Sequence, residues 1–301
     1  MSASTVPTGF TAVVNPAAGR GTGLLAARRL AAVLPAGAVE VEVSHGAAHA
    51  SELAAGACER GRTVVAVGGD GHAAAVAGAV VAAGGVLGLA AVGRGNDFAR
   101  QLGVPADPAV LAGVLLAGRT RRVDVLECAG RVVLGSVYVG VDSVATAVVN
   151  ARPRVPQALV YPYGALRALL TFAPVGFRLV LDGREWSERG YTVVVANSGY
   201  YGAGMHIVPT AEVDDGLADV LVIRDSSRWN LMLSLRQAYR GTHLGRPDVE
   251  VRRARRVEIV LDRPVPVCGD GEELAEAPVE VRVRPGALRV LVPGPPAAGP
   301  R

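Results

Sequence analysis

The most constraining stretch of the chain is the apolar run 64–67, which leads directly into Gly68-Gly69-Asp70-Gly71. The run Val-Val-Ala-Val has no polar alternation, which predicts a strand buried on both faces, as in a parallel sheet. The glycines let a ligand approach the backbone without meeting a Cβ. The alanine-rich segment 73–81 follows and predicts a helix whose first N–H groups face the loop. A strand, a glycine loop and a helix N-terminus together favour an anion site, with phosphate as the common occupant.

The segments around this stretch alternate between strand-like and helix-like patterns, which is typical of a doubly wound α/β domain. Ligands of such sheets bind beyond the carboxyl ends of the strands. Glycine-bearing loops at 15–21, 68–71 and 93–96 fall at that edge, so we expect them to converge on one ligand, although 68–71 alone could be a plain tight turn. The predicted strands are 11–14, 39–43, 64–67 and 86–92, and the predicted helices are 24–34, 48–60, 73–81 and one beginning near residue 97.

The pattern changes after about Val123, where β-like segments dominate. We expect an α/β domain over 1–123 and a mainly antiparallel β-sandwich domain over 124–286. A last strand at 288–292 precedes a Pro/Gly-rich tail, 294–301, which is expected to be flexible. The predicted strands of the second domain include 131–139, 177–181, 191–196, 220–223, 257–261 and 279–283, and its predicted helices are 163–172 and 230–239.

Composition narrows the classes of protein that the chain can represent. Half of the 301 residues are hydrophobic and only 4% are aromatic, so the core is built from Val, Ala and Leu. All of the basic residues other than histidine are arginines. The net charge of +4 is too small to indicate nucleic acid binding. Cys58, Cys128 and Cys268 are widely separated, which favours a reducing, cytoplasmic compartment.

Targeting and membrane-spanning segments are not expected. Residues 1–10 lack the basic region and the apolar core of a signal peptide. The uncharged run 73–92 has the length of a membrane span, but Ala and Gly dominate it and Gly84-Gly85 interrupts it. We interpret it as a buried helix followed by a buried strand in a soluble protein.

Four motifs in order give the chain a resemblance to a known family. They are Asn-Pro-x-x-Gly at 15–19, Gly-Gly-Asp-Gly at 68–71, Gly-x-Gly-Asn-Asp-Phe-Ala-Arg at 93–100 and Asp-Gly-Glu at 270–272. With the segment 196–205, this order resembles the diacylglycerol kinase catalytic-domain family. It is most similar to the soluble bacterial lipid kinases, relatives of the sphingosine kinases. The likeness runs from Val13 to about Val292, nearly the whole chain.

The resemblance implies an ATP-dependent kinase that phosphorylates a lipid hydroxyl, with diacylglycerol or a related lipid as the first candidate. It implies a nucleotide cleft between the domains and a final strand, 287–293, that completes the first domain. Glu272 matches the family's general base, with Asp270 beside it, and Asp70 acts on metal or phosphate. Magnesium in the second domain is implied at Asp215, the main-chain oxygen of Leu217 and Glu212. The implied nucleotide-binding residues are Asn15, Gly19, Ser44, Gly68, Gly69, Asp70, Gly71, His72, Gly93, Arg94, Gly95, Asn96 and Asp97.

Several residues depart from the family's pattern. His72 and Arg94 stand where the family usually has threonine, and Ala74 and Ala75 replace the usual Asn and Glu. Arg94 could grip a phosphate, because guanidinium matches phosphate geometry, or its bulk could obstruct ATP. A catalytically weak or inactive nucleotide- or lipid-binding homologue therefore stays an alternative, as does an NAD or sugar kinase of the same superfamily. The Asp-Gly pair at 270–271 could also be only a hairpin turn.

The expected partner is a lipid substrate at a membrane surface, which would make the protein cytoplasmic and peripheral to the membrane. The run Arg252-Arg253-Ala254-Arg255-Arg256 could attract an anionic membrane, or it could be a solvated strand edge protected from aggregation. Exposed β edges in the second domain also make a homodimer an open alternative.

Overall fold

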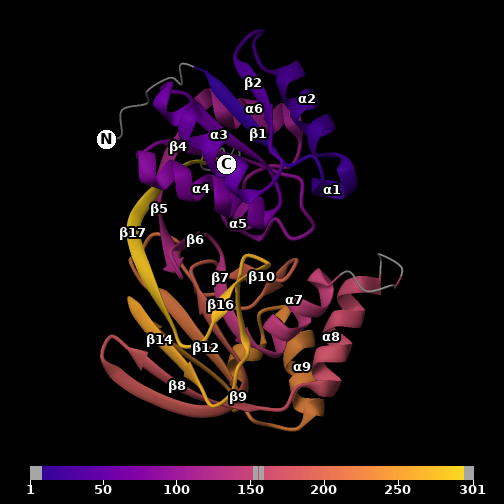
Figure 1. Ribbon diagram of the computed structural model, residues 1–301, viewed down its shortest axis with the longest axis vertical. Helices are drawn as coiled ribbons and strands as arrows, with labels where there is room; N and C mark the ends of the chain where they lie inside the picture. The colour runs from indigo at the N-terminus through magenta and orange to yellow at the C-terminus, as the bar shows by residue number, and fades with distance from the viewer. Residues whose placement is uncertain (1–8, 152–154, 156–158, 295–301) are drawn as a thin grey trace, which may run out of the picture. The chain divides into compact units, whose positions relative to one another are not determined.

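The computed structural model describes residues 9–151, 155 and 159–294, and most of the expected tail and of the N-terminal segment lies outside this range. The chain forms two compact units (Figure 1). The first unit consists of the chain up to Asp124 together with the chain from Gly286 onward. The second unit is Val125–Pro285.

The first unit is a parallel sheet in the order β17-β4-β3-β1-β2, with helices packed against it. The strand β2, which alternates Val and Glu, lies at the edge and is half-exposed, whereas β1 and β3 are fully buried. The strands are β1 (Phe10–Val14), β2 (Val39–Val43), β3 (Thr63–Gly68), β4 (Val86–Ala91) and the end of β17 (Val279–Leu291). The helices are α1 (Ala18–Gly21), α2 (Gly23–Val33), α3 (Ala47–Glu59), α4 (Asp70–Ala83), α5 (Asp97–Gln101) and α6 (Pro108–Ala117).

Helices cover both faces of this sheet, which makes the unit doubly wound. One core cluster joins α2 and α6 to alternate residues of the central strands, among them Ala12, Val14, Val65 and Val67. The intervening residues of β1 and β3 point the other way and are also buried. On that side α3 packs on α4, α3 contacts β1, and α4 contacts β3. Burial on both faces explains why these strands read as unbroken apolar runs.

The second unit is built on antiparallel strands. The long strand β9 pairs with β8 along its first half, and along its second half with β7 on one side and β12 on the other. The strands are β5 (Thr120–Cys128, continuing from the first unit), β6 (Arg131–Val133), β7 (Ser136–Gly140), β8 (Val175–Leu181), β9 (Arg184–Ala196), β10 (Tyr200–Tyr201), β11 (Met205–His206), β12 (Ala218–Arg224), β13 (Val249–Ala254), β14 (Arg256–Leu261), β15 (Pro266–Gly269), β16 (Glu272–Glu276) and the start of β17. The helices are α7 (Val141–Asn150), α8 (Val160–Thr171), α9 (Arg228–Ala238) and the 3-10 turn η2 (His243–Gly245).

The strand β17 belongs to both units. Its residues 279–282 pair antiparallel with β14, and Arg289 and Val290 pair parallel with β4. In the first unit the Gly286 N–H donates to Asp124 Oδ1 at 2.7 Å, which ties β17 to the end of β5 within that unit. The last strand therefore completes the sheet of the first unit.

Three elements differ from the sequence-based expectation. The helix α4 begins at Asp70 rather than at Ala73, because Gly69 serves as its N-cap and an acidic residue in the first turn suits the helix dipole. The helix α6 is apolar all round, so it shows no helical periodicity, although the Asp107 cap and Pro108 mark its start. The helix α7 is rich in β-branched residues, so its sequence looks like that of the β-like segments around it. Among the described residues, no helix is long and apolar enough to cross a membrane.

The core of the first unit gives a matched pair of substitutions on α6. Leu115 is fully buried between α6 and the sheet, whereas its neighbour Leu116 is 45% exposed. Leu115→Ala should lower the free energy of unfolding by about 2–5 kcal/mol, because it removes buried methyl groups and leaves a cavity. Leu116→Ala should change it by less than about 0.5 kcal/mol. Urea unfolding checks both, and equal effects of the two substitutions would contradict this packing.

Candidate functional site

The glycine loops of the first unit meet at one edge of the parallel sheet. The register aligns Val14 with Val67 and Gly68 with Ala91, so the three central strands end together. The Asn15 N–H donates to the Val67 carbonyl at 3.0 Å, and the Val92 N–H donates to the Gly68 carbonyl at 2.9 Å. Parallel strands that end in register bring the loops after them to the same edge, where α/β proteins bind their ligands.

Close backbone approach holds the three loops together. A Cβ placed on Gly93 would lie 2.6 Å from the Gly69 Cα, so this approach requires glycine at position 93. A Cβ on Gly19 would lie 2.7 Å from the Val92 carbonyl oxygen. The second loop therefore contacts the third, and the first loop contacts the residue that precedes the third. A narrow hollow at this place is lined by parts of the second and third loops, including Gly69, Asp70 and Asn96.

Two carboxylates of these loops converge on Gly95. A Cβ added there would lie 2.8 Å from Asp70 Oδ2 and 2.9 Å from Asp97 Oδ2, so both oxygens border one small space. Desolvation raises the pKa of Asp70, while backbone N–H donors at the start of α5, Phe98 among them, act in the opposite direction. Two hard, anionic oxygen ligands beside a phosphate-type loop are the donor set that Mg²⁺ prefers. The residues present therefore fit a magnesium ion.

Three other predicted residues of this unit have polar atoms that bond within the protein. The imidazole Nε2 of His72 lies 2.9 Å from the Val13 carbonyl oxygen, and since a carbonyl only accepts, Nε2 carries the hydrogen. Burial lowers the pKa of His72, which favours the neutral ring. The Ser44 hydroxyl donates to the Val14 carbonyl at 2.9 Å, and Asn15 Oδ1 accepts the Ala17 N–H at 3.0 Å. These contacts fix the end of β1 and the turn that follows it.

The remaining predicted residues of the first unit lie on the same loops. Gly71 is in the first turn of α4, directly after Asp70. Asn96 closes the third loop, because its Oδ1 accepts the Gly93 N–H at 2.7 Å and its Nδ2 donates to the Gly93 carbonyl at 3.0 Å. Arg94 is exposed within this closed loop. It lies in the loop between the two carboxylates, Asp70 and Asp97, in the folded unit.

In the second unit, two of the family-like motifs hold one turn between β6 and β7. The two oxygens of Asp270 accept the N–H groups of Leu134 at 2.7 Å and Gly135 at 2.9 Å. From the other motif, Asn197 Nδ2 donates to the Leu134 carbonyl at 2.8 Å, and the Asn197 N–H donates to the Gly135 carbonyl at 2.9 Å. The N–H and carbonyl groups of Leu134 and Gly135 are thus all hydrogen-bonded to Asp270 or Asn197.

The Asp-Gly-Glu motif is also a hairpin turn. Asp270 and Gly271 both have positive φ, and they connect β15 to β16 in antiparallel register. This turn type favours Asp-Gly, so the structural interpretation of the motif is correct. It does not compete with a functional role, because the turn places Glu272 at the start of β16 with an exposed side chain. Asp270 faces the Leu134 turn, and Glu272 faces solvent.

Among the predicted metal residues of the second unit, Asp215 is paired with an arginine. Asp215 forms an ion pair with Arg253 and accepts the Leu217 N–H at 2.9 Å. Arg253 also lies 3.7 Å from Asp219, whose pKa is raised to about 6 by burial and by the charge of Glu212. Within the described ranges, no three His, Cys, Asp or Glu side chains group as metal ligands. The guanidinium already neutralises Asp215, so this donor set does not fit a metal ion as arranged.

Asp142 is a partly buried carboxylate that the sequence pattern did not single out. It follows β7 at the start of α7, and its oxygens accept hydrogen bonds from Thr192 Oγ1 at 2.6 Å and from the Tyr201 hydroxyl at 3.2 Å. Burial raises the pKa of Asp142 to about 6, against an ordinary value of 3.8. The available signal was a strand, a glycine and an acidic residue opening a helix, as at Asp70. It was lost because α7 did not read as a helix.

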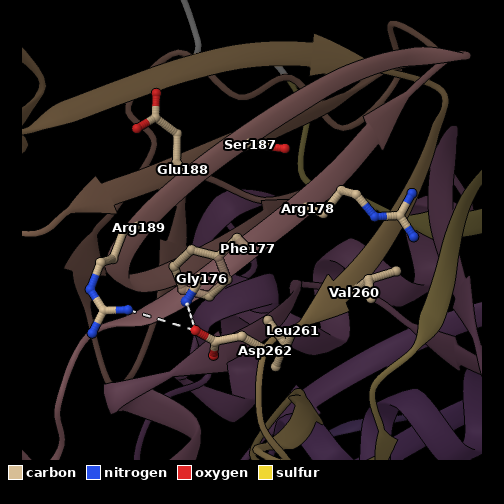
Figure 2. Close-up of a pocket in the computed structure, with 9 residues that line it drawn as sticks. All are labelled: Gly176, Phe177, Arg178, Ser187, Glu188, Arg189, Val260, Leu261 and Asp262. Atoms are coloured by element: carbon tan, nitrogen blue, oxygen red, sulfur yellow. Dashed lines mark hydrogen bonds and ion pairs between the residues drawn. The ribbon is translucent and has the colours of Figure 1, made fainter.

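A larger hollow in the second unit is separate from these residues. It is an open depression of about 580 Å³ over β8, β9 and β14 (Figure 2). Asp262 at its margin accepts the Gly176 N–H at 2.9 Å and lies 3.6 Å from Arg189 (Figure 2). None of the predicted site residues lines it, and it is an open surface over the sheet rather than an enclosed pocket. We therefore do not assign the activity to it.

Comparison with known proteins identifies both units. The family model of the diacylglycerol kinase catalytic domain matches residues 9–128, and that of the YegS C-terminal NAD kinase beta sandwich-like domain matches residues 135–292. A diacylglycerol kinase from Mycobacterium tuberculosis is 33% identical, over 94% of this chain and 94% of its own. A YegS-like lipid kinase from Pseudomonas aeruginosa is 32% identical, over 77% of this chain and 76% of its own.

Solved structures show the same fold. A crystal structure of a candidate diacylglycerol kinase from Bacillus anthracis has a TM-score of 0.79 at 21% identity and covers 97% of both chains. A second structure, of a diacylglycerol kinase from the same organism, has a TM-score of 0.72 at 19% identity, over 96% of this chain and 98% of its own. The fold and the matches define a kinase, that is, a phosphotransferase. The chain belongs to the diacylglycerol kinase catalytic domain family.

The raised pKa of Asp142 predicts a pH-dependent stability. Because its folded pKa is raised, the folded state holds this proton more tightly, and stability should fall as pH rises from about 4 to about 6. Asp142→Asn keeps an acceptor for Thr192 but removes the charge. Relative to the Asn variant, the wild type should lose about 3 kcal/mol of unfolding free energy across that range.

Urea unfolding at a series of pH values measures this difference. Asp219 titrates in the same range in both proteins and therefore cancels in the comparison. A difference between wild type and variant that stays constant from pH 4 to pH 7 would contradict the burial of this carboxylate.

Proposed function

We propose that this protein transfers the γ-phosphoryl group of ATP to the hydroxyl of diacylglycerol or a closely related lipid. The observation that carries the proposal is the convergence of Asp70 and Asp97 on Gly95, at the edge where three glycine loops meet. The relatives that match nearly the whole chain support the lipid as acceptor, because they include a diacylglycerol kinase.

The first unit would bind the nucleotide. Phosphoryl transfer depends mainly on positioning and on neutralising charge. Gly69 and Gly93 let the second and third loops pack closely, and the N-terminus of α4 directs its first N–H groups to the same place. Asp70 and Asp97 would hold Mg²⁺, which supplies charge neutralisation on the phosphates when it is bound. Arg94, exposed on the third loop, would add a cationic contact to a phosphate.

The second unit would supply the general base. A lipid hydroxyl has a pKa far above 7, so a carboxylate that accepts its proton assists the attack. Glu272 suits this role because its carboxylate is exposed at the start of β16. Asp270 uses both oxygens to hold the Leu134–Gly135 turn, so we assign it the positioning of the hairpin that carries Glu272.

A nucleotide- and lipid-binding protein with weak or no turnover is the second candidate. It is favoured by His72, whose ring nitrogen bonds the Val13 carbonyl and therefore does not replace a threonine hydroxyl near the phosphates. An NAD or sugar kinase is less well supported, because the curated relatives described above are named for lipid kinase activity.

Transfer of labelled γ-phosphate from Mg·ATP tests the proposal. The substrates would be diacylglycerol, a sphingoid base and ceramide in mixed micelles, with NAD and a sugar phosphate as soluble controls. Glu272→Gln should lower kcat by about 10²–10⁴-fold, the usual contribution of a general base. Asp270→Asn keeps one acceptor for the turn and should lower kcat by less than about tenfold.

The two variants distinguish the base from its support. A larger kcat loss in Asp270→Asn than in Glu272→Gln would make Asp270 the base and overturn our assignment. Label in NAD or in the sugar would overturn the lipid acceptor. ATP binding without transfer to any acceptor would establish the second candidate.

A further inference from the structure

The outward face of α9 carries large apolar side chains where a surface helix is normally polar. Leu231, Ser234 and Ala238 face inward and are nearly inaccessible. On the opposite side Trp229 is 67% exposed, and Met232 and Leu233 are each 38% exposed. Tyr239, directly after the helix, is 59% exposed. Single exposed apolar residues are common, but three on one short helix with a fourth directly after it indicate a surface that is covered in use.

The same face is cationic and carries no acid. Arg236 and Arg240 lie among these side chains, and the stretch 226–247 contains no Asp or Glu. Across the described ranges, neither arginine forms an ion pair with a carboxylate of the protein. We call Trp229, Met232, Leu233, Arg236, Tyr239 and Arg240 the α9 surface.

The arginine run at 252–256 is different, because carboxylates pair with three of its four arginines. Arg252 pairs with Glu250 at 2.7 Å and lies over the Trp186 ring at 4.0 Å. Arg253 pairs with Asp215, and Arg256 pairs with Glu258 at 3.1 Å. These contacts favour the interpretation of the run as a strand with compensated charges. The α9 surface is therefore the better candidate for attracting an anionic partner.

We propose that the α9 surface docks on an anionic phospholipid bilayer; this inference rests on the proposed function, since a lipid kinase must reach a substrate held in a membrane. Interfacial helices combine Trp, Leu and basic residues, and Trp and Tyr favour the level of the lipid headgroups. Arginines near the surface add electrostatic attraction to anionic lipid. α9 lies in the second unit (Figure 1).

A second copy of the chain fits this surface less well. A two-fold interface is self-complementary, so it would bring the α9 surfaces of two copies together. Arg236 and Arg240 would then face a surface that carries no carboxylate to pair with them. Charge complementarity therefore favours anionic lipid over self-association.

The chain contains its own fluorescent probe for the test. It has two tryptophans, of which Trp186 is buried and Trp229 is exposed. In a Trp186→Phe variant, Trp229 emission should shift to shorter wavelength on vesicles of phosphatidylcholine and phosphatidylglycerol. Brominated phosphatidylcholine in these vesicles should quench it. The reciprocal variant, Trp229→Phe, keeps only Trp186 and should show neither change. If Trp186→Phe does not fold, the comparison of Trp229→Phe with the wild type gives the same information.

Substitutions on the α9 surface should weaken binding of the full chain to these vesicles in a sedimentation assay. Arg236→Gln with Arg240→Gln should raise the apparent Kd about 25-fold, which corresponds to about 1 kcal/mol for each basic residue. Met232→Ser with Leu233→Ser should also weaken binding. The matched controls lie on α2, where Leu25 is 47% exposed and Arg28 and Arg29 are exposed. Leu25→Ser and the pair Arg28→Gln, Arg29→Gln should leave binding unchanged.

Unchanged Trp229 emission, or equal binding by the α9 variants and the α2 controls, would overturn the docking proposal. So would light scattering that shows the α9 variants converting a dimer to a monomer with vesicle binding intact. Transfer to a short-chain diacylglycerol dissolved as monomers separates the two proposals. The α9 variants should retain that transfer. Vesicle binding by a protein that phosphorylates no lipid would overturn the proposed function and leave the docking surface standing.

Discussion

The common register of β1, β3 and β4 is the constraint on which the rest of the first unit depends. Because three buried parallel strands end in register, the loops that follow them lie at the same edge of the sheet. Contact between those loops then requires glycine, because a Cβ on Gly93 would collide with the backbone at Gly69. The two acidic residues that follow the second and third loops are brought to one point by the same geometry. The proposed phosphate site is thus a consequence of how the strands end.

In the second unit, hydrogen bonds between distant segments position the candidate general base. Its candidate base is placed by a hairpin, and the hairpin is fixed by the bonds from Asp270 to the turn at Leu134 and Gly135. Asn197, which lies far away in sequence, bonds the other side of that turn. A motif that looks like a simple Asp-Gly turn is therefore part of a network that spans three segments of the chain. The residues that form the hairpin turn are therefore the same ones that are proposed to position Glu272.

Most of the first unit could be predicted from sequence, because its strands are continuous apolar runs and its loops are marked by glycine. The doubly wound class and the position of the loops at one edge follow from that pattern, whereas the roles of Asp70 and Asp97 were implied only by the family resemblance. What could not be predicted depends on contacts between segments distant in sequence. The His72 bond to Val13 and the Arg253 pair with Asp215 depend on side-chain positions that no local pattern encodes. Asp142 was missed for another reason, since β-branched residues in α7 concealed the helix that it opens.

The central claim is that Asp70 and Asp97 form the magnesium-dependent part of a nucleotide site. Calorimetric titration of ATP into the protein, with and without Mg²⁺, tests it without relying on turnover. The wild type should bind ATP more tightly when Mg²⁺ is present. Asp70→Asn and Asp97→Asn should each lose most of that gain while binding of ATP alone is retained. An unchanged Mg²⁺ effect in both variants would contradict the account.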